Sequence, residues 1–394
     1  MRIAVISDIH AYEDGGGGPK PSFLNTRLPE DQPARHPFAG LMQLIGGDGT
    51  IRADILVCCG DIGDKASPAG IDWAWKWLDR IRVELGASRT FATSGNHDLD
   101  SRYLYTDHDA KGVLQALNPL YPLDDADAND RYWSRNFAVE LANDCRIVTL
   151  NSAAYHGVDD EWEHGRVSAR TLTRLQQALV DSPNQLANVL ICHHHPFRLG
   201  DIDLDDYSEM KGGDALLALL GSGAFGRWLI IHGHRHWPSL SYAPGGATSP
   251  IVFAAGSFSA VLYPELGTRA RNQFYILDLP ISDYPAMGLG LVGEFHAWDW
   301  SSNVGWIPAH EGSGLPHRGG FGTRDGGDLI AAQIADQFTA TTDPFLSWED
   351  VCAQSPRVRF LLPTDIAMCT RALEEEYGIN VLTRDGYPMQ IGTP

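Results

Sequence analysis

The chain has 394 residues, a length that fits one large domain with an extension or two domains. Hydrophobic residues make up 43% of the chain and charged residues 20%, values that are ordinary for globular proteins and argue against long disorder. The formal net charge of −20 disfavours a protein that grips extended nucleic acid, because such proteins present clustered Lys and Arg to the phosphates. A small phosphorylated substrate at a cationic metal centre is compatible with this charge.

The sequence predicts a cytoplasmic protein without a membrane span. No apolar stretch reaches the roughly 18 residues that cross a bilayer, and the first residues enter a strand without a basic-then-apolar signal segment. The six cysteines lack the paired spacing of zinc and redox motifs, so we expect small buried side chains in a reducing compartment. The oligomeric state is not predicted.

Strands and helices alternate along the first three quarters of the chain. Short apolar runs bounded by turn residues predict strands, and apolar residues at helical spacing predict helices. The expected strands lie at residues 2–7, 54–59, 89–93, 145–150, 189–192, 227–231, 251–255, 273–279 and 290–298. The expected helices lie at residues 38–45, 70–86, 168–179 and 213–220.

Three long segments, residues 11–52, 99–135 and 199–213, are expected to ring a cleft. The glycine run Gly15–Gly18 lacks the Lys-Ser/Thr pair of a phosphate-binding P-loop, so we interpret it as a flexible loop at the rim. The acidic run at residues 201–206 is interpreted as a solvated loop. Four side chains are either substrate contacts or, by default, ordinary surface residues: Arg102, Tyr103, His108 and Tyr155.

The composition changes after Trp300. Residues 301–327 are rich in Gly, Ser, His and Pro, which predicts a linker or lid, and residues 328–394 predict two or three helices. We therefore predict a catalytic domain over residues 1–300 and a partly helical C-terminal extension over residues 301–394. The role of the extension is open.

Five short apolar runs end in side chains that bind metals. They are Asp8-Ile9-His10, Gly60-Asp61-Ile62-Gly63-Asp64, Gly95-Asn96-His97-Asp98, His193-His194-His195-Pro196 and His232-Gly233-His234-Arg235-His236. The loops at the carboxyl ends of parallel strands gather along one edge of a sheet, so the side chains that follow these runs should converge. The converging donors are Asp8, His10, Asp61, Asn96, His194, His234 and His236.

Carboxylate, amide and imidazole donors in this combination suit Mn, Fe, Zn or Co. Seven donors are too many for one ion and reasonable for two. Two ions about 3.5–4 Å apart need a shared carboxylate, and Asp61 is the natural bridge because it follows a central apolar strand. Such a pair activates a bridging hydroxide for in-line attack on phosphorus and neutralises charge on the phosphoryl oxygens.

The order of the motifs, D-x-H, G-D-x-x-D, G-N-H-D, H-x-P and G-H-x-H, resembles that of the calcineurin-like metallophosphoesterase superfamily over roughly residues 1–300. The resemblance implies an α/β fold, a two-sheet αββα sandwich with a dinuclear site at the strand ends. It implies that one metal is held by Asp8, His10 and His236. It implies that the other is held by Asn96, His194 and His234, with Asp61 bridging the two.

The resemblance also assigns a role to two residues beside the ligands. His97 would touch the scissile phosphate or protonate the leaving oxygen, and Asp64 would orient His97. The family places its histidine ligand two residues before a proline, which fits His194. Neighbouring strand residues alternate in direction, so we expect His193 to point to the opposite face, while His195 could line the pocket instead.

Among functions, the motifs are most similar to the bacterial cyclic-nucleotide and glycerophosphodiester phosphodiesterase branch. Protein phosphatases of the superfamily continue as G-D-x-V-D-R-G and G-N-H-E, and Ile62-Gly63-Asp64-Lys65-Ala66 departs from that pattern. We therefore predict a metal-dependent phosphodiesterase acting on a small phosphorylated substrate. A phosphomonoesterase acting on a small phosphorylated metabolite, and a non-catalytic scaffold with the same fold, are the alternatives.

Overall fold

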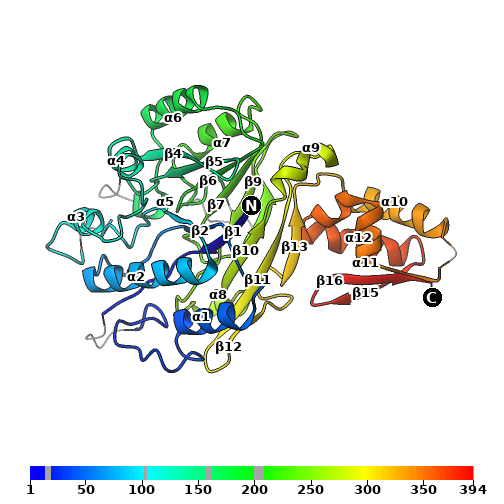
Figure 1. Cartoon of the computed structure of the whole chain (residues 1–394), viewed down its shortest axis with the longest axis horizontal. Coiled ribbons are helices and arrows are strands. Elements are labelled where there is room, and N and C mark those ends of the chain that lie inside the picture. Colours follow the sequence, from blue (N-terminus) through cyan, green and yellow to red (C-terminus); the bar gives the residue numbers. More distant parts are fainter. Residues whose placement is uncertain (14–18, 102–103, 156–160, 199–207, 342, 394) are drawn as a thin grey trace.

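The computed structural model describes residues 1–394 except 14–18, 102–103, 156–160, 199–207, 342 and 394. The glycine run Gly15–Gly18, the acidic run at 201–206, and Arg102 and Tyr103 lie outside the described residues. The described chain forms two large mixed sheets with helices on their outer faces, followed by a C-terminal unit of helices and a small sheet (Figure 1). This architecture confirms the predicted αββα sandwich and its C-terminal extension.

The first sheet has the strand order β12-β11-β10-β1-β2-β3, with β13 also pairing with β11. Strands β1, β2 and β3 are parallel, whereas β10 to β13 pair antiparallel. The bounds are β1 (Arg2–Ile6), β2 (Ile55–Cys58), β3 (Arg89–Ala92), β10 (Asn272–Asp278), β11 (Gly293–Ser301), β12 (Gly305–Pro308) and β13 (Arg318–Phe321).

The second sheet has the strand order β4-β5-β6-β7-β9-β8. Its inner strands β5, β6, β7 and β9 are parallel, and the outer strands β4 and β8 are antiparallel to their neighbours. The bounds are β4 (Phe137–Ala142), β5 (Cys145–Leu150), β6 (Ala187–Ile191), β7 (Trp228–His232), β8 (Ser239–Tyr242) and β9 (Ile251–Ala254).

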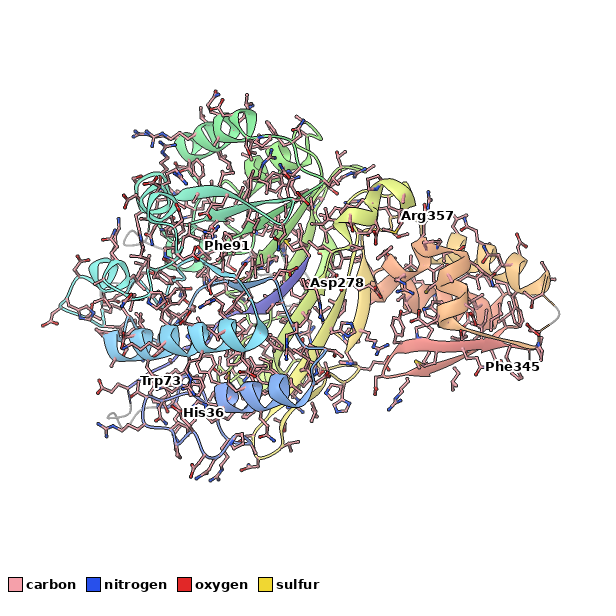
Figure 2. All side chains as sticks on the ribbon, viewed as in Figure 1. His36, Trp73, Phe91, Asp278, Phe345 and Arg357 are labelled. Carbon is pink, nitrogen blue, oxygen red and sulfur yellow. The ribbon has the colours of Figure 1, made fainter. Side chains whose placement is uncertain are left out.

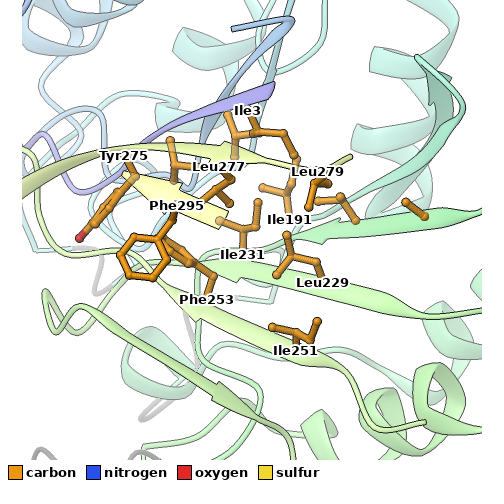
Figure 3. Packing of buried hydrophobic residues seen from close by; sticks show 14 of the residues in the cluster. Ile3, Ile191, Leu229, Ile231, Ile251, Phe253, Tyr275, Leu277, Leu279 and Phe295 are labelled. Atoms are coloured by element: carbon orange, nitrogen blue, oxygen red, sulfur yellow. The ribbon is translucent and has the colours of Figure 1, made fainter. Parts of the chain in front are cut away.

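The largest hydrophobic cluster lies between the two sheets (Figure 3). Ile3 and Leu277 from the first sheet and Ile191, Leu229 and Phe253 from the second belong to it, and each is fully buried. Because the central strands are also covered on their outer faces, they read in the sequence as continuous apolar runs rather than alternating ones. This is why the apolar runs in the sequence predicted the central strands correctly.

Helices cover the outer face of each sheet, which completes the sandwich. Helices α1 and α2 pack on the first sheet, and α6 and α7 pack on the second. At the junction of α1 and α2 the rings of His36 and Trp73 lie 5.7 Å apart (Figure 2). The bounds are α1 (Pro37–Gly47), α2 (Pro68–Leu85), α3 (Ala110–Gln115), α4 (Ala126–Arg135), α5 (Glu161–His164), α6 (Ala169–Asp181), α7 (Gly213–Gly221), α8 (Pro264–Gly267) and α9 (Tyr284–Met287).

Capping residues set the ends of these helices. The Ser67 side chain accepts a hydrogen bond from the Gly70 N–H at the start of α2, and Gly86 ends it in the left-handed conformation with φ 73°. Ser168 caps α6 in the same way, through the Thr171 N–H. None of the described helices has both the length and the apolar character that crossing a membrane requires. All six cysteines are buried.

The C-terminal unit has its own hydrophobic core and a three-stranded sheet of order β14-β16-β15. Its elements are α10 (Gly327–Thr339), β14 (Phe345–Ser347), α11 (Trp348–Gln354), α12 (Pro363–Glu375), β15 (Asn380–Arg384) and β16 (Tyr387–Gly392). Figure 2 shows Arg357 on the side of this unit that faces the sandwich and Phe345 at its far end.

The segment that we expected to be a glycine-rich linker, residues 301–327, instead contributes β12 and β13 to the first sheet. Its glycines serve close packing. A Cβ at Gly320 would lie 2.1 Å from the Arg359 carbonyl oxygen, and one at Gly319 would lie 2.5 Å from the Phe295 ring. The C-terminal unit is therefore seated directly on β13, with Phe360 and Leu362 joining the core between the sheets.

We expect Gly320→Ala to destabilise the protein by about 1–3 kcal/mol, because the added methyl group meets backbone that must move. Gly49→Ala is the matched control, since a Cβ at Gly49 meets nothing within 4 Å; its effect should stay within about 0.5 kcal/mol. Urea unfolding followed by tryptophan fluorescence measures both. Equal midpoints for the two variants would show that the C-terminal unit is not seated tightly on β13.

Candidate metal centre

Five strands deliver the predicted donors to one edge of the sandwich. Strands β1, β2 and β3 end shortly before Asp8, Asp61 and Asn96, and β6 and β7 end shortly before the two histidine clusters. Backbone bonds join the first two strand ends, since Ile9 and His10 both donate N–H bonds of 2.9 Å to the Asp61 carbonyl. The convergence predicted from parallel strand ends is therefore present, and it includes strands of both sheets.

The backbone at this edge is strained. Non-glycine residues with positive φ cluster here, with values of 53° at Asp8, 52° at His10, 52° at Asp61, 78° at His234 and 55° at His236. Each such conformation costs about 1–3 kcal/mol and persists only where the surrounding structure enforces it. The strain therefore marks this edge as a functional site, independently of the residue types.

Two glycines of the motifs permit the donors to approach one another. A Cβ at Gly95 would lie 2.1 Å from Asp61 Oδ1, and a Cβ at Gly233 would lie 2.4 Å from Asp8 Oδ2. Any side chain at either position would displace a carboxylate. The glycines that precede Asn96 and His234 are thus required by close packing against the two aspartates.

One group of donors consists of Asp8, His10 and His236. The Nε2 atoms of His10 and His236 are 3.1 Å apart, and His236 Nε2 is 3.4 Å from Asp8 Oδ1. Asp8 and His10 are buried, while the His236 side chain is 18% exposed. These three residues are the ones that the resemblance assigns to one metal.

A second group surrounds the Asn96 side-chain oxygen. This Oδ1 atom lies 3.1 Å from His193 Nε2 and 3.0 Å from His234 Nδ1. His194 joins the group, because ligand atoms of His193, His194 and His234 lie within 4.8 Å of one another. The Nε2 atom of His234 faces the Glu163 carbonyl oxygen at 2.8 Å, which fixes the ring.

Asp61 lies between the two groups. Its Oδ2 atom is 3.7 Å from His10 Nε2 and 3.3 Å from His193 Nε2. Its Oδ1 atom accepts a 2.7 Å hydrogen bond from the His97 backbone N–H. This carboxylate is therefore the one whose position faces both sets of donors.

The expected direction of His193 was wrong. We expected it to point away from the site, yet its Nε2 atom lies within 3.3 Å of both Asn96 Oδ1 and Asp61 Oδ2. Strand β6 ends at Ile191, so the alternation of side chains no longer applies two residues later. His195 lies farther from the donors, buried with its ring 6.3 Å from that of His232 and 5.9 Å from that of His234.

Ser152 positions the histidine cluster and was not predicted. Its Oγ atom is 2.8 Å from His194 Nδ1 and accepts backbone N–H bonds from His193 at 3.3 Å and His194 at 3.2 Å. The sequence signal was available, because Asn151 and Ser152 directly follow the apolar strand β5 in the same manner as the motifs. Serine is less specific than aspartate or histidine, which is why it was overlooked.

Asp98, the last residue of the Gly-Asn-His-Asp motif, joins two strand-end loops. Its carboxylate accepts backbone N–H bonds from Asp61 at 2.8 Å, Gly63 at 3.0 Å and Gly95 at 2.9 Å. Burial, followed by the nearby charge of Asp61, raises the pKa of Asp98 to about 6 despite these bonds. Asp98 therefore holds the loop of Asp61 against the loop of Asn96.

His97 and Asp64 lie at the border of the centre. His97 Nδ1 is 3.0 Å from Asp64 Oδ1, and the His97 side chain is 25% exposed. Burial raises the pKa of Asp64, but the nearby His10 ring, 3.9 Å away, and the hydrogen bond with His97 outweigh it and hold the pKa far below its usual range. The contact is the one expected if Asp64 orients His97.

The electrostatics of the donors suit cations. Burial opposes ionisation of Asp61, yet His193 and His97 hold its pKa well below the usual range. Asp61 in turn raises the pKa of His193 to about 9 against the effect of burial, whereas burial lowers the pKa of His10 and His234. The ionised Asp61 and the neutral imidazoles of His10 and His234 are in the states that divalent metals require, and a bound cation would displace the proton that Asp61 stabilises on His193. The residues present therefore fit a pair of transition-metal ions.

The remaining candidates lie outside this constellation. His108 is exposed, and the Tyr155 hydroxyl is engaged with the Asn136 side chain at 3.2 Å and with Ser168 Oγ at 2.9 Å. His232 is fully buried and its Nδ1 atom faces the Gly233 carbonyl, as expected of a core residue.

A family model described as calcineurin-like phosphoesterase matches residues 1–262. The chain belongs to this family. All five predicted motifs lie within the matched residues. A second model, wHTH-Calcineurin_assc, matches residues 319–375, so the C-terminal unit is similar to a winged helix-turn-helix.

Two solved structures resemble this chain at low identity and low structural similarity. A purple acid phosphatase, PPD1, from yellow lupin (Lupinus luteus) seeds is 13% identical, with a TM-score of 0.47 over 78% of this chain and 52% of that protein. A 5'-nucleotidase from Candida albicans is 12% identical, with a TM-score of 0.39 over 77% and 52%. The chain thus spans about half the length of both proteins. No curated protein sequence matches the chain.

We expect Asp98→Ala to destabilise the protein by about 3 kcal/mol or more, because it leaves three buried N–H donors without an acceptor. The same change should reduce metal uptake, since it releases the loops of Asp61 and Asn96. Urea unfolding and elemental analysis measure the two effects. Asp130→Ala, at an exposed position of α4, is the control, and equal unfolding midpoints would contradict the joining role of Asp98.

Proposed function

We propose that the protein is a phosphodiesterase with a dinuclear centre of Mn, Fe, Zn or Co ions. The observation that carries this proposal is the position of Asp61, whose carboxylate faces His10 of one donor group and His193 of the other. A single shared carboxylate between two sets of imidazoles is what a pair of neighbouring cations needs to offset their repulsion.

Under this proposal one ion would be held by Asp8, His10 and His236, with Asp61 shared. The other would be held by Asn96, His234 and the histidines of the His193–His195 cluster, among which both His193 and His194 have a nitrogen near the group. Bound ions would supply an activated water and neutralise charge on the phosphoryl oxygens. No protein nucleophile is required.

The chain's own residues hold and deliver a proton. His97 keeps Nδ1 on the Asp64 carboxylate at 3.0 Å, and under this proposal Nε2 is the nitrogen that protonates the leaving oxygen. Its backbone N–H binds Asp61, which ties the proton donor to the shared carboxylate. Ser152 orients His194, and Glu163 orients His234 through its carbonyl group.

Charge favours a diester over a monoester. The formal net charge of the chain is −20, and a phosphate monoester carries about −1.5 to −2 at neutral pH whereas a diester carries only one negative charge. The departure of Ile62-Gly63-Asp64-Lys65-Ala66 from the protein-phosphatase motif points the same way. The substrate that fits is a small phosphodiester.

The C-terminal unit does not favour a nucleic acid over a small phosphodiester as the substrate. Its last helix, α12, ends with Glu374 and Glu375 and is followed by Glu376, and all three are exposed. A helix that binds nucleic acid presents Lys and Arg to the phosphates, whereas the glutamates at this end of α12 would repel the phosphates. We therefore propose no extended nucleic acid partner, despite the similarity to a winged helix-turn-helix.

With Mn supplied, we expect kcat/KM for bis(p-nitrophenyl) phosphate to exceed that for p-nitrophenyl phosphate by about tenfold or more, since the monoester brings an additional charge. Release of p-nitrophenol measures both reactions. A preference for the monoester would favour the phosphomonoesterase alternative. Turnover of neither ester by metal-loaded protein would favour a scaffold.

Two substitutions distinguish the role of the shared carboxylate, Asp61, from that of the proton donor, His97. Asp61→Asn should abolish turnover and weaken the binding of both ions, because it removes the charge that both share. His97→Ala should keep both ions and slow turnover by about 10²–10⁴-fold, the usual contribution of a general acid. Elemental analysis beside the p-nitrophenol assay gives the two readouts.

His310→Ala, at an exposed position, serves as the control and should change neither metal content nor rate. Loss of metal in His97→Ala would show that this ring is a ligand rather than a proton donor. Full metal content in Asp61→Asn would contradict the shared role of the carboxylate.

A further inference from the structure

A small cavity of about 190 Å³ lies at the junction of the sandwich and the C-terminal unit. The sandwich contributes the first residues of β7 and β9 and the loop at 288–291, and the other wall comes from residues 322–325 and Arg357. Figure 2 shows Arg357 on the side of the C-terminal unit that faces the sandwich. The cavity adjoins the start of β7, whereas His234 and His236 follow its end, so this junction cavity is separate from the candidate metal centre.

The charged side chains that line the junction cavity are three arginines and one aspartate, namely Arg227, Arg324, Arg357 and Asp325. Asp325 is engaged with Arg357 at 3.0 Å. In the part of the chain that the structure describes, Arg227 and Arg324 form no ion pair. Partial burial lowers the pKa of Arg324, and the nearby charge of Arg227 lowers it further. A chain with a formal net charge of −20 thus places two uncompensated positive charges beside one cavity.

The surroundings hold the two uncompensated arginines in place. The Arg324 guanidinium lies over the Tyr242 ring at 4.0 Å and donates a 3.1 Å hydrogen bond to Ser249 Oγ and another to the Ser249 carbonyl. Gly290 leaves room for the stem of Arg227, since a Cβ at this glycine would lie 3.3 Å from Arg227 Cγ. Side chains that are already ordered lose less conformational entropy when they bind an anion.

The loop that carries Arg324 is tied to both units. The Tyr242 hydroxyl of β8 donates a 2.6 Å hydrogen bond to the Thr323 carbonyl. On the other side, the Thr323 hydroxyl donates a 2.8 Å bond to the Arg357 carbonyl, and the Thr323 N–H binds the Phe360 carbonyl at 3.0 Å. The wall of the junction cavity is therefore built by hydrogen bonds that cross from the sandwich to the C-terminal unit.

A buried donor in the same wall lacks an acceptor. Trp228 lines the junction cavity and is only 1% exposed. Among the described residues its indole N–H has no hydrogen-bond partner. Burying an N–H group without an acceptor costs free energy, so such donors usually have a partner. A bound anion would bring acceptor oxygens to this wall.

The size and charge of the junction cavity fit a phosphate group. Its volume equals that of about six water molecules at about 30 Å³ each, and it is below the roughly 300 Å³ at which sites for larger organic ligands begin. A phosphate dianion carries about −1.5 to −2 charges, which matches the two arginines that no carboxylate neutralises. The planar guanidinium group binds phosphate oxygens in pairs. A carboxylate would bring only one negative charge.

We propose that the junction cavity binds a dianionic phosphate group and thereby fastens the C-terminal unit to the sandwich. Arg227 contributes from the sandwich and Arg357 from the C-terminal unit, so one anion contacts both. The phosphate group is either free phosphate or the head of a small phosphorylated metabolite. This inference goes beyond the proposed function and does not depend on it, because the cavity and the metal centre lie at opposite ends of β7.

Calorimetric titration of the full chain with inorganic phosphate tests the proposal. The Asp61→Asn variant is used throughout, so that any phosphate still held at the metal centre is the same in every comparison. Adding Arg227→Gln should weaken phosphate binding at least about tenfold, because charge-assisted hydrogen bonds are lost. Arg371→Gln, at an exposed position of α12 away from the cavity, should leave the affinity unchanged. Titration with glycerol phosphate beside inorganic phosphate assigns the source, according to which of them binds more tightly.

Urea unfolding tests the fastening of the C-terminal unit. The unfolding midpoint should be higher in phosphate than in chloride of equal ionic strength, because the anion binds only the folded state. Arg357→Gln should remove this dependence on phosphate beyond the general effect of phosphate salts, which Arg371→Gln reports. Equal phosphate affinities in the Arg227→Gln and Arg371→Gln proteins overturn the site, and Arg357→Gln replaces Arg227→Gln in that comparison if the latter does not fold. Equal midpoint shifts in the Arg357→Gln and Arg371→Gln proteins overturn the fastening role.

Discussion

The burial of the Asp61 carboxylate among imidazoles is the interaction on which the rest of this structure depends. A carboxylate that is only 1% exposed is stable when charges and hydrogen bonds surround it, and here the partners come from both sheets. The sandwich must therefore hold the ends of β1, β2, β3, β6 and β7 in a fixed relation. Left-handed backbone at Asp8, Asp61 and His234 adds a cost that the packed strands have to offset.

The central strands could be predicted from the sequence because both of their faces are covered, which produces uninterrupted apolar runs such as Ile55–Cys58. Strands β4 and β13 could not be predicted in this way. Strand β4 mixes buried and exposed positions, and β13 consists largely of glycine, so neither carries the apolar signal. Glycine-rich sequence resembles a linker when read alone. In β13 it is required because the backbone of Arg359 and Phe360 lies against it.

The residues of the candidate metal centre could be predicted for a different reason. Aspartate and histidine immediately after a buried strand are costly unless they serve a site, so motif and position together identified the seven residues that the structure brings to one edge. The direction of each side chain was harder to predict. His193 lies two residues beyond the end of β6, where turn geometry replaces strand alternation. Asp98 binds only backbone N–H groups, and such partners have no sequence signature.

The strand order places the C-terminal unit away from the strands that carry the residues of the candidate metal centre. The C-terminal unit is seated on β13, which pairs with β11, and two strands, β11 and β10, lie between β13 and the first donor-bearing strand, β1. Phe360 and Leu362 extend the core between the sheets from that side. A change in the C-terminal unit therefore acts on the candidate metal centre through the stability of the sandwich. A change in the loops that follow β1, β2, β3, β6 and β7 acts on the centre directly, so the chemistry of the centre and the stability of the fold are able to vary independently in this chain.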